Sequence, residues 1–380
     1  MSTCGMVNNK PIIRRLAAFA RKDAVLIIAL VCAGVSSAFV PIGPSYLDYI
    51  DWKVLSCLFC LMSVVAGLRG LGVFDIAAAA TSRFASGARM IAFILIGLTF
   101  FLSMAITNDV ALITVVPFSL IMLKNVTRSR TRMTVITLQT IAANVGSSLT
   151  PVGNPQNLYL FSHYGMDAGT FFSGIFPIVA VGGALLFVAI FTIPNEPVRN
   201  DVGPHNHGPQ AIPMIVYAVL FAASVLSVFR ALPYIPVTIV VLVAVVIMDR
   251  RILRRVDYSL LLTFVGFFIF IGNLQAIETV REFLIKVSSF DITLVSAIAS
   301  QFISNVPAAL LFSRFTDDAV GLLRGVSIGG LGTLIASLAS VISYKFFCAE
   351  RKEESLAYLG VFTFWNVAFF LVLYGVQRLI

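Results

Sequence analysis

Charged residues are scarce in this sequence. Asp, Glu, Lys and Arg make up only 12% of its 380 residues, whereas an ordinary soluble domain carries about 25%. Hydrophobic residues account for 59%, and the mean hydropathy is +0.96. Several apolar runs approach or exceed the roughly 17 to 25 residues with which a helix crosses a bilayer. The composition excludes a soluble protein and predicts an all-α polytopic membrane protein.

Residues that usually carry metal, redox or nucleotide chemistry are also few. Of the three histidines, His163 lies at a helix end, and His205 and His207 lie in a linker, where a solvated pair is favoured over a metal site. Cys57 and Cys60 form a CxxC, but inside an apolar run at helical i, i+3 spacing. The P-loop motif of ATP-binding proteins is absent. We therefore expect no enzyme, no cofactor and no structural metal.

Basic residues occur in short clusters between the apolar runs. The formal net charge is +9, but no single hydrophilic domain carries it, so nucleic acid is not an expected partner. Loops rich in Lys and Arg stay on the cytoplasmic side of membrane proteins. The clusters lie in segments 1–23, 69–89, 124–132, 250–255 and 345–352. This pattern predicts a multi-pass protein of the plasma (inner) membrane with a cytoplasmic N-terminus.

The apolar runs predict about nine spans and two interrupted stretches. The spans are expected at 24–41, 53–69, 133–162, 170–193, 211–229, 235–249, 258–275, 319–346 and 357–377. A short polar motif interrupts the stretches 90–123 and 291–315, and either a re-entrant hairpin or two full crossings would fit the loop charges. A hairpin is favoured for the first, because its second arm is short and includes Pro117, which breaks helical hydrogen bonding.

Two polar segments of the sequence match without a gap. Segments 144–158 and 327–341 pair glycine with glycine, threonine with threonine, and small polar residues with one another. The matched pairs, each 183 positions apart, are Gly146 with Gly329, Thr150 with Thr333, Asn154 with Ser337 and Asn157 with Ser340. Upstream, Thr107-Asn108 parallels Ser304-Asn305. The two halves of the chain are therefore predicted to be repeats.

A single connecting helix between the halves would cross the membrane once and would therefore invert the orientation of the second repeat in the membrane. That arrangement is the inverted-repeat plan of many secondary transporters, whose sites lie near the membrane midplane. The predicted parts are a cytoplasmic segment (1–23), a first repeat (24–193) with hairpin 90–123 and broken helix 133–162, a linker and connecting helix (194–234), and a second repeat (235–380) with hairpin 291–315 and broken helix 319–346.

The segment 145–157 is too rich in Gly and Pro to remain a continuous helix. Unwound backbone inside a membrane must line an enclosed polar cavity, where helix N-termini can face an anion and carbonyl or amide oxygens can hold a cation. Helix packing, the alternative role for small polar residues, suits Ser103, Ser296 and Ser300 better than the motifs. The predicted substrate and ion contacts are Thr107, Asn108, Asp109, Asn144, Gly146, Ser147, Ser148, Thr150, Gly153, Asn154, Asn157, Ser304, Asn305, Thr333 and Ser337.

Asp109 is a carboxylate in the middle of an apolar stretch. Inserting such a group costs about 2.5 to 3.5 kcal/mol, so a compensating interaction is expected. Asp109 could carry a proton, or a bound Na⁺ could keep it ionised. An inert contact with free amides at the hairpin tip is the remaining alternative. A Na⁺ ion, if bound, is expected at Asn108, Asp109 and Asn144.

At these motifs the chain resembles the ion transporter superfamily, which includes citrate-transporter-like proteins, divalent anion:sodium symporters and arsenical pump permeases. The resemblance covers most of the chain and is specific in residues 107–109, 143–157 and 304–308. It implies a homodimer with an elevator mechanism, and hairpin tips at which a Ser-Asn-Thr motif binds carboxylate and sodium. Here the tips read Thr-Asn-Asp and Ser-Asn-Val, a departure that weakens the case for sodium-coupled dicarboxylate transport.

The sequence thus predicts secondary active transport of a small anion, coupled to Na⁺ or H⁺ by alternating access, with the lipid bilayer as its surroundings. Arsenite efflux or Na⁺/H⁺ antiport, by members of the same superfamily, is the alternative. An intramembrane enzyme would need a His, Asp or Cys cluster within the spans. Because polar residues are denser in the first half, we expect 107–109 and 144–157 to supply most contacts.

Overall fold

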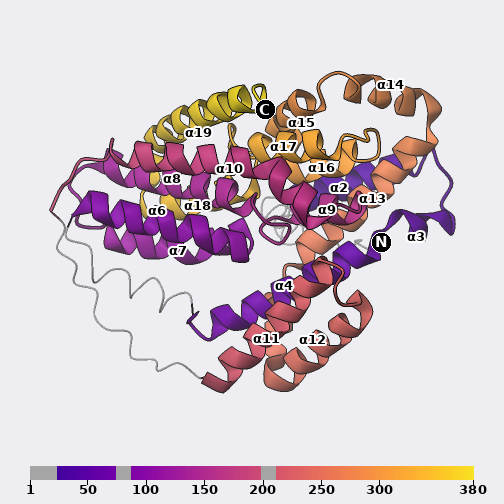
Figure 1. Ribbon diagram of the computed structural model, residues 1–380, viewed down its shortest axis with the longest axis horizontal. Coiled ribbons are helices and arrows are strands. Elements are labelled where there is room, and N and C mark those ends of the chain that lie inside the picture. Colours follow the sequence, from indigo (N-terminus) through magenta and orange to yellow (C-terminus); the bar gives the residue numbers. More distant parts are fainter. Residues whose placement is uncertain (1–23, 74–86, 198–210) are drawn as a thin grey trace, which may run out of the picture.

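The computed structural model describes residues 24–73, 87–197 and 211–380, and these residues are largely helical (Figure 1). The predicted segment 1–23, and much of the linker with His205 and His207, lie outside the described residues. In the first half the helices are α2 (Ala24–Ser36), α3 (Ser45–Tyr49), α4 (Trp52–Gly70), α6 (Ala88–Ala105), α7 (Asn108–Met122), α8 (Ser129–Ser147), α9 (Pro155–His163), α10 (Ala168–Ile190) and α11 (Ala211–Val228).

The second half repeats this alternation of long and short helices. Its elements are α12 (Tyr234–Asp249), the 3₁₀ helix η1 (Arg250–Arg255), α13 (Tyr258–Ala276), α14 (Glu278–Ser288), α15 (Ile292–Ile303), α16 (Asn305–Phe312), α17 (Ala319–Gly329), α18 (Leu338–Glu350), the 3₁₀ helix η2 (Lys352–Glu354) and α19 (Ser355–Gln377). Within the described ranges there is no β-sheet, and a single isolated bridge joins Gly87 to Pro197.

Six of the described helical segments are long and apolar enough to cross a membrane. A seventh arises if α14 and α15, which bend by 114° at their junction, count as one span. Large apolar side chains face outward along such helices, as at Phe101 of α6 and Val188 of α10. Because lipid is the solvent that suits this surface, the chain is a multi-pass, all-helical membrane protein. The count of nine spans stays a prediction.

The helices break where polar motifs interrupt the sequence. α6 ends at Ala105 and α7 begins at Asn108, while α8 and α9 are separated by unwound residues 148–154. In the second half, α15 and α16 meet at Ser304, and residues 330–337 separate α17 from α18. Ser304 has a φ of 72°, a left-handed conformation that strains a residue with a side chain.

Pro117 and the segment after α13 are two local features of the helices. Pro117 lies inside α7 without ending it, because a proline removes only the hydrogen bond to the carbonyl of Ile113, and the helix continues around that gap. The segment that follows α13 carries Glu278 and Glu282. It forms α14, an amphipathic helix that buries Leu284 and leaves its carboxylates exposed.

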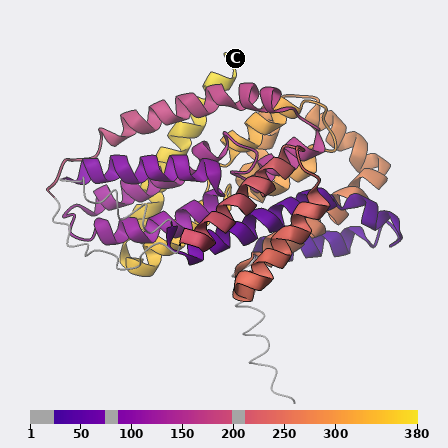
Figure 2. The ribbon, with the colours of Figure 1, turned by 60° about the horizontal axis from the view of Figure 1, so that its bottom comes forward.

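The helices pack in corresponding pairs. α2 packs against α13 as α12 packs against α4, and α6 packs against α8 as α15 packs against α17. α7 contacts α18 as α16 contacts α9, and α8 contacts α19 as α17 contacts α10. The connecting helix α11 lies beside α4 and α12, and this group sits to one side of the broken helices (Figures 1 and 2).

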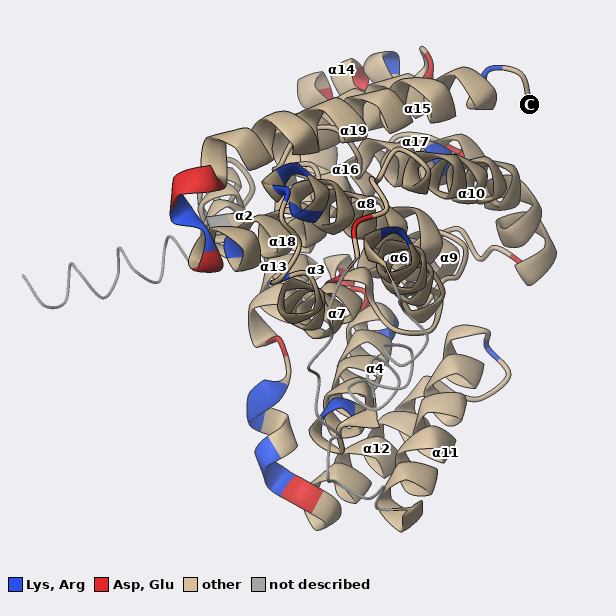
Figure 3. Ribbon diagram, turned by 90° about the vertical axis from the view of Figure 1, so that its left-hand side faces the viewer, with Lys and Arg blue, Asp and Glu red and all other residues tan. Residues whose placement is uncertain are grey.

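The ends of the helices meet in two separate sets of contacts. In the first set, the amide of Ala88 donates to the carbonyl of Glu196 at 2.8 Å, and Ser129 Oγ donates to Glu354 Oε1 at 2.9 Å. Both contacts join segments beside the basic clusters. Figure 3 shows charged residues gathered at helix ends, with the helix bodies mostly free of charge.

The second set joins segments that the loop charges place on the opposite side. Tyr164 OH donates to the carbonyl of Thr316 at 2.8 Å, and Asn273 Nδ2 donates to Ser36 Oγ at 3.0 Å. Tyr374 OH donates to an oxygen of the Asp291 carboxylate at 3.0 Å. The tertiary contacts therefore sort the helix ends into the same two groups as the loop charges do.

Candidate substrate and ion site

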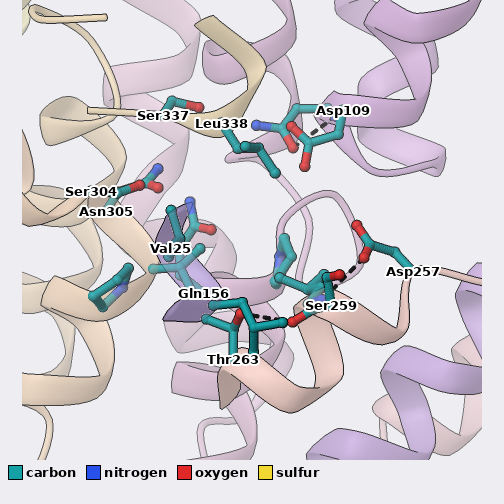
Figure 4. Close-up of a pocket in the computed structure, with 16 residues that line it drawn as sticks. Val25, Asp109, Gln156, Asp257, Ser259, Thr263, Ser304, Asn305, Ser337 and Leu338 are labelled. Carbon is teal, nitrogen blue, oxygen red and sulfur yellow. Dashed lines mark hydrogen bonds between the residues drawn. The ribbon is translucent and has the colours of Figure 1, made fainter. Parts of the chain in front are cut away.

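A cavity of about 720 Å³, including the part open to solvent, lies where the broken helices meet (Figure 4). The lining residues are Val25, Leu26, Asn108, Asp109, Pro155, Gln156, Asp257, Ser259, Leu260, Thr263, Ser304, Asn305, Val306, Pro307, Ser337 and Leu338. They include two carboxylates and no Lys, Arg or His. An anion bound in this cavity would therefore have no basic side chain in the lining to pair with.

Four helices begin at this cavity. α7 begins at Asn108, α9 at Pro155, α16 at Asn305 and α18 at Leu338, and all four residues line it. A helix N-terminus presents free amide groups and a partial charge of about +0.5. The convergence of four N-termini makes the surroundings favourable to an anion even though no basic side chain lines the walls.

The tip of the first hairpin is held by its own asparagine. The backbone amide of Asn108 donates to the carbonyl of Gly153 at 3.1 Å, and its Nδ2 donates to Asn144 Oδ1 at 3.0 Å. Its Oδ1 accepts from the amide of Asp109 at 2.9 Å. These bonds fix the start of α7 against the unwound segment and leave the Asp109 side chain at the cavity.

Asn144 joins the two halves behind the cavity wall. Its Oδ1 accepts from both Asn108 Nδ2 and Ser337 Oγ, each at 3.0 Å, and its Nδ2 donates to the carbonyl of Gly330 at 3.3 Å. The side chain is buried and does not line the cavity. The structure thus gives Asn144 a positioning role, since it orients two residues that do line the cavity.

The second hairpin tip repeats the contacts of the first. The amide of Asn305 donates to the carbonyl of Ala336 at 3.0 Å, which corresponds to the bond from Asn108 to Gly153. Ser304 Oγ also donates to the carbonyl of Ala336, at 3.3 Å. The Asn305 side chain is only 4% exposed, lines the cavity, and has no hydrogen-bond partner within the described protein.

Two further polar groups at the cavity lack partners. Asp109 Oδ1 and Gln156 Nε2 are buried without a hydrogen bond among the described residues, and both residues line the cavity with Asn305. Leaving a buried polar group unpaired costs about 1 to 3 kcal/mol. A ligand that pairs with a carboxylate and two amides would recover this energy, which makes the three side chains the strongest candidates for direct contact.

Most of the other predicted site residues stabilise the unwound segments. Asn157 Nδ2 lies within hydrogen-bonding distance of three carbonyls between residues 147 and 150, at 3.1 to 3.4 Å. The hydroxyls of Ser147 and Ser148 donate to the carbonyl of Asn144. Thr150 Oγ1 donates to the carbonyl of Met104 at 2.6 Å. None of these side chains reaches the cavity.

The remaining predicted residues lie around the hairpin arms. Thr333 Oγ1 donates to the carbonyl of Gln301 at 2.8 Å, in the position that corresponds to Thr150. Gly146 and Gly153 allow close backbone approach, and Asn154 precedes α9 with its Oδ1 unpaired. Thr107 lines a separate apolar cavity of about 240 Å³ beside α4 and α11. Of the fifteen predicted contacts, the structure places Asn108, Asp109, Ser304, Asn305 and Ser337 at the cavity.

The residues at the cavity mouth were missed by the sequence analysis. Asp257, Ser259 and Thr263 belong to the start of α13, and Val25 belongs to the start of α2. Asp257 follows the arginine-rich η1, and its side chain accepts from the amide of Leu260 at 3.0 Å. In the sequence Asp257 has the pattern of an ordinary helix N-cap, and no neighbouring residue indicates that it lines a cavity.

Similarity to known proteins assigns the chain to a family. Residues 12–321 match the citrate transporter family model, CitMHS. The chain belongs to the citrate transporter family. It is 33% identical to an uncharacterized transporter of Methanocaldococcus jannaschii over 78% of this chain and 81% of that protein. It is also 30% identical to the inner membrane protein YbiR of Escherichia coli, over 83% and 86% of the two chains.

A third relative, the 46 kDa membrane protein of Mycobacterium leprae, is 24% identical over 77% of this chain and 78% of that protein. The family and the names of its members indicate a transporter and not an enzyme. The predicted resemblance is therefore confirmed for the citrate-transporter-like branch. This member of the citrate transporter family departs from a Ser-Asn-Thr tip in both hairpins, as its sequence shows.

Proposed function

We propose that this transporter carries a small anion together with Na⁺ or H⁺, by alternating access around the cavity. The observation that supports this most directly is the meeting of four helix N-termini with two buried unpaired groups, Asp109 Oδ1 and Gln156 Nε2, and with the lining amide of Asn305. The N-termini and amides suit an anion, and the carboxylate suits the coupling cation. The two charges would then neutralise one another inside the membrane.

The inverted repeat belongs to this proposal and is supported by matched hydrogen bonds. Gly153 and Ala336, which accept from the two tip asparagines, are 183 positions apart, as are Thr150 and Thr333. The residues before the second half-helices, Asn154 and Ser337, share φ of −142° with ψ of 143° and 140°. Such paired geometry is what two copies of one unit would produce. A homodimer and elevator movement follow from the family resemblance alone.

The cavity opens beside η1, and we infer that this face is cytoplasmic. Asp257 at the mouth is exposed and lies two residues after Arg250–Arg255, the most basic described loop. Under the positive-inside rule this is a conformation open to the cytoplasm. The printed name of the E. coli relative, an inner membrane protein, supports the same location for this chain.

Na⁺/H⁺ antiport is the second candidate. The cavity lining favours it in one respect, because it contains two carboxylates and no basic side chain. In that case cations alone would cross, and the helix N-termini would serve only to hold the unwound segments. Flux measurements with candidate anions separate the two functions.

The experiment that tests the proposal is flux into proteoliposomes under imposed Na⁺ and H⁺ gradients, with citrate, succinate, sulfate and arsenite as separate probes. We expect Asp109→Asn to change the Na⁺ or pH dependence of uptake by about tenfold or more, because it removes the only buried carboxylate of the cavity.

Glu282→Gln is the matched control, since it removes an exposed carboxylate of α14 that does not line the cavity and should leave the dependence unchanged. If the Na⁺ and pH dependence of uptake is unchanged in Asp109→Asn, Asp109 has only a structural role. Cation exchange that requires none of the four anions would favour the antiport alternative.

A further inference from the structure

Asp257 is the second carboxylate of the cavity and lies at its mouth. It is exposed to solvent, whereas Asp109 lies deeper, with Oδ1 buried and unpaired. Figure 4 shows the two carboxylates on one side of the cavity, with Ser304 and Asn305 on the other. The two acidic residues come from different elements, the N-cap of α13 and the first turn of α7. The cavity therefore has an acidic side that runs from solvent to its interior.

The opposite side of the cavity carries only neutral polar groups. Ser304, Asn305 and Gln156 offer hydroxyl and amide oxygens, which are suitable ligands for a hard cation or partners for an anion. Among the described residues no group of three or more His, Cys, Asp and Glu side chains could hold a metal ion tightly. Two separated carboxylates suit a cation that is held weakly and can move between them.

We propose that Asp257 is the first binding point for Na⁺ at the mouth of the cavity, from which the ion passes inward to Asp109. The proposal rests on the cation-coupled function above and extends it by naming the route of the ion. A negative charge at the rim of a low-dielectric opening raises the local cation concentration and the rate of binding. Asp257 supplies that charge within the lining, whereas the arginines of η1 lie beside the mouth and outside the lining.

The capping role of Asp257 can be separated from its charge. The cap uses Oδ1, which accepts from the amide of Leu260 at 3.0 Å, and leaves the other carboxylate oxygen for a cation. Asn and Ser are as good as Asp at the N-cap position. Asp257→Asn and Asp257→Ser therefore keep the start of α13 while removing the charge.

The chain offers a matched control on the same loop. Asp249 caps η1 by accepting from the amide of Arg251 at 2.9 Å, and it does not line the cavity. Asp249→Asn removes one negative charge from the loop and preserves a cap. A general effect of loop charge would appear in both variants, and an effect of the cavity mouth would appear only in Asp257→Asn.

The test measures equilibrium binding of radioactive Na⁺ to the full chain in lipid nanodiscs, at low and high ionic strength set with N-methylglucamine chloride. We expect Asp257→Asn and Asp257→Ser to weaken Na⁺ binding by about tenfold at low ionic strength, with Asp249→Asn unchanged. The difference should shrink at about 1 M salt, where the screening length falls to about 3 Å. A purely structural effect would not depend on salt in this way.

Each outcome separates the two proposals. If both Asp257 variants bind Na⁺ as the wild type does, while Asp109→Asn does not, the route through Asp257 is overturned and the proposed function stands. If the wild type binds no Na⁺ but drives uptake with a pH gradient, Asp257 has no role in Na⁺ binding and coupling to H⁺ at Asp109 remains. If neither cation has any effect, both proposals fail.

Discussion

Asn144 and Asn305 are both buried asparagines of the site, but their surroundings differ. Asn144 is part of three hydrogen bonds that connect the first hairpin tip with the second broken helix. Asn305 lines the cavity with a side-chain amide that has no partner among the described residues. A satisfied buried amide stabilises the fold, and an unsatisfied one costs stability until a ligand binds it.

The two asparagines should therefore respond differently to truncation. We expect Asn144→Ala to abolish transport and to lower stability by about 2 to 3 kcal/mol, because Asn108 and Ser337 lose their common acceptor. Asn305→Ala should also abolish transport, but its thermal unfolding temperature in detergent should equal or exceed that of the wild type. Flux and thermal unfolding, measured on the same preparations, provide the comparison.

Membrane insertion and a monodisperse elution profile are the controls for both variants. Normal transport in both would show that the paired motifs are not the site. A large loss of stability in Asn305→Ala would show instead that its amide is paired within the protein.

At the scale of elements, the hairpins pack closely against the broken helices through glycines. A Cβ atom at Gly146 of α8 would lie 2.3 Å from the carbonyl oxygen of Phe100 in α6. In the second half of the chain, a Cβ atom at Gly329 would lie 2.7 Å from Ser300 Oγ in α15. Each hairpin arm thus rests against its broken helix at a distance that only glycine allows, and this contact sets the position of the tip.

Replacing one of these glycines tests that contact. We expect Gly146→Ala to lower stability by about 1 to 3 kcal/mol and to reduce transport, because the obstructing atom belongs to the backbone and cannot move alone. Gly97→Ala in α6 is the matched control. No atom lies within 4 Å of its added Cβ, so it should be neutral or more stable by up to about 1 kcal/mol.

Thermal unfolding of both variants in one detergent gives the comparison. Equal stability of Gly146→Ala and Gly97→Ala would show that α6 and α8 can separate without a loss of stability. The close contact at Gly146 would then not determine the position of the hairpin tip.

In each half of the chain, the last residues contact the start of the hairpin. Residues after α10 contact the start of α6, where the amide of Ala88 donates to the carbonyl of Glu196. Residues at the end of α19 contact the start of α15, where Arg378 pairs with Asp291 and Tyr374 OH donates to the same carboxylate. The arms of each hairpin are thereby fixed at the base and at the tip, so each hairpin should move as one body with its broken helix.

For the whole molecule, the sorting of helix ends into two groups makes a prediction about sides. The group that contains η1 is expected in the cytoplasm, and the group that contains the start of α10 outside it. In a variant whose five cysteines are replaced by alanine, Ala168→Cys should react with a membrane-impermeant maleimide in intact cells. Arg254→Cys should react only after permeabilisation. Both positions are exposed, so access depends on the membrane.

The opposite labelling pattern would invert the whole topology, and would place the mouth of the cavity at Asp257 on the outer face. Labelling of both positions in intact cells would mean that the two groups of helix ends do not face opposite sides of a membrane.

Much of this architecture follows from the sequence, because it depends on local chemistry. Scarce charge and long apolar runs determine a helical membrane protein, and Gly- and Pro-rich polar motifs determine where the helices break. The sequence match between the halves includes Thr150 and Thr333, 183 positions apart, and the hydroxyls of these residues form corresponding contacts in the structure.

Only the tertiary structure decided which polar residues face the cavity. Asn144, Asn157 and Thr150 looked like ligands in the sequence, but their partners are carbonyls and amides brought close by the fold. Asp257 looked like a simple helix cap, yet the packing of α13 places it at the same cavity as Asp109. Composition determines that buried polar groups need partners, and only the packing of distant helices determines which of them remain available to a ligand.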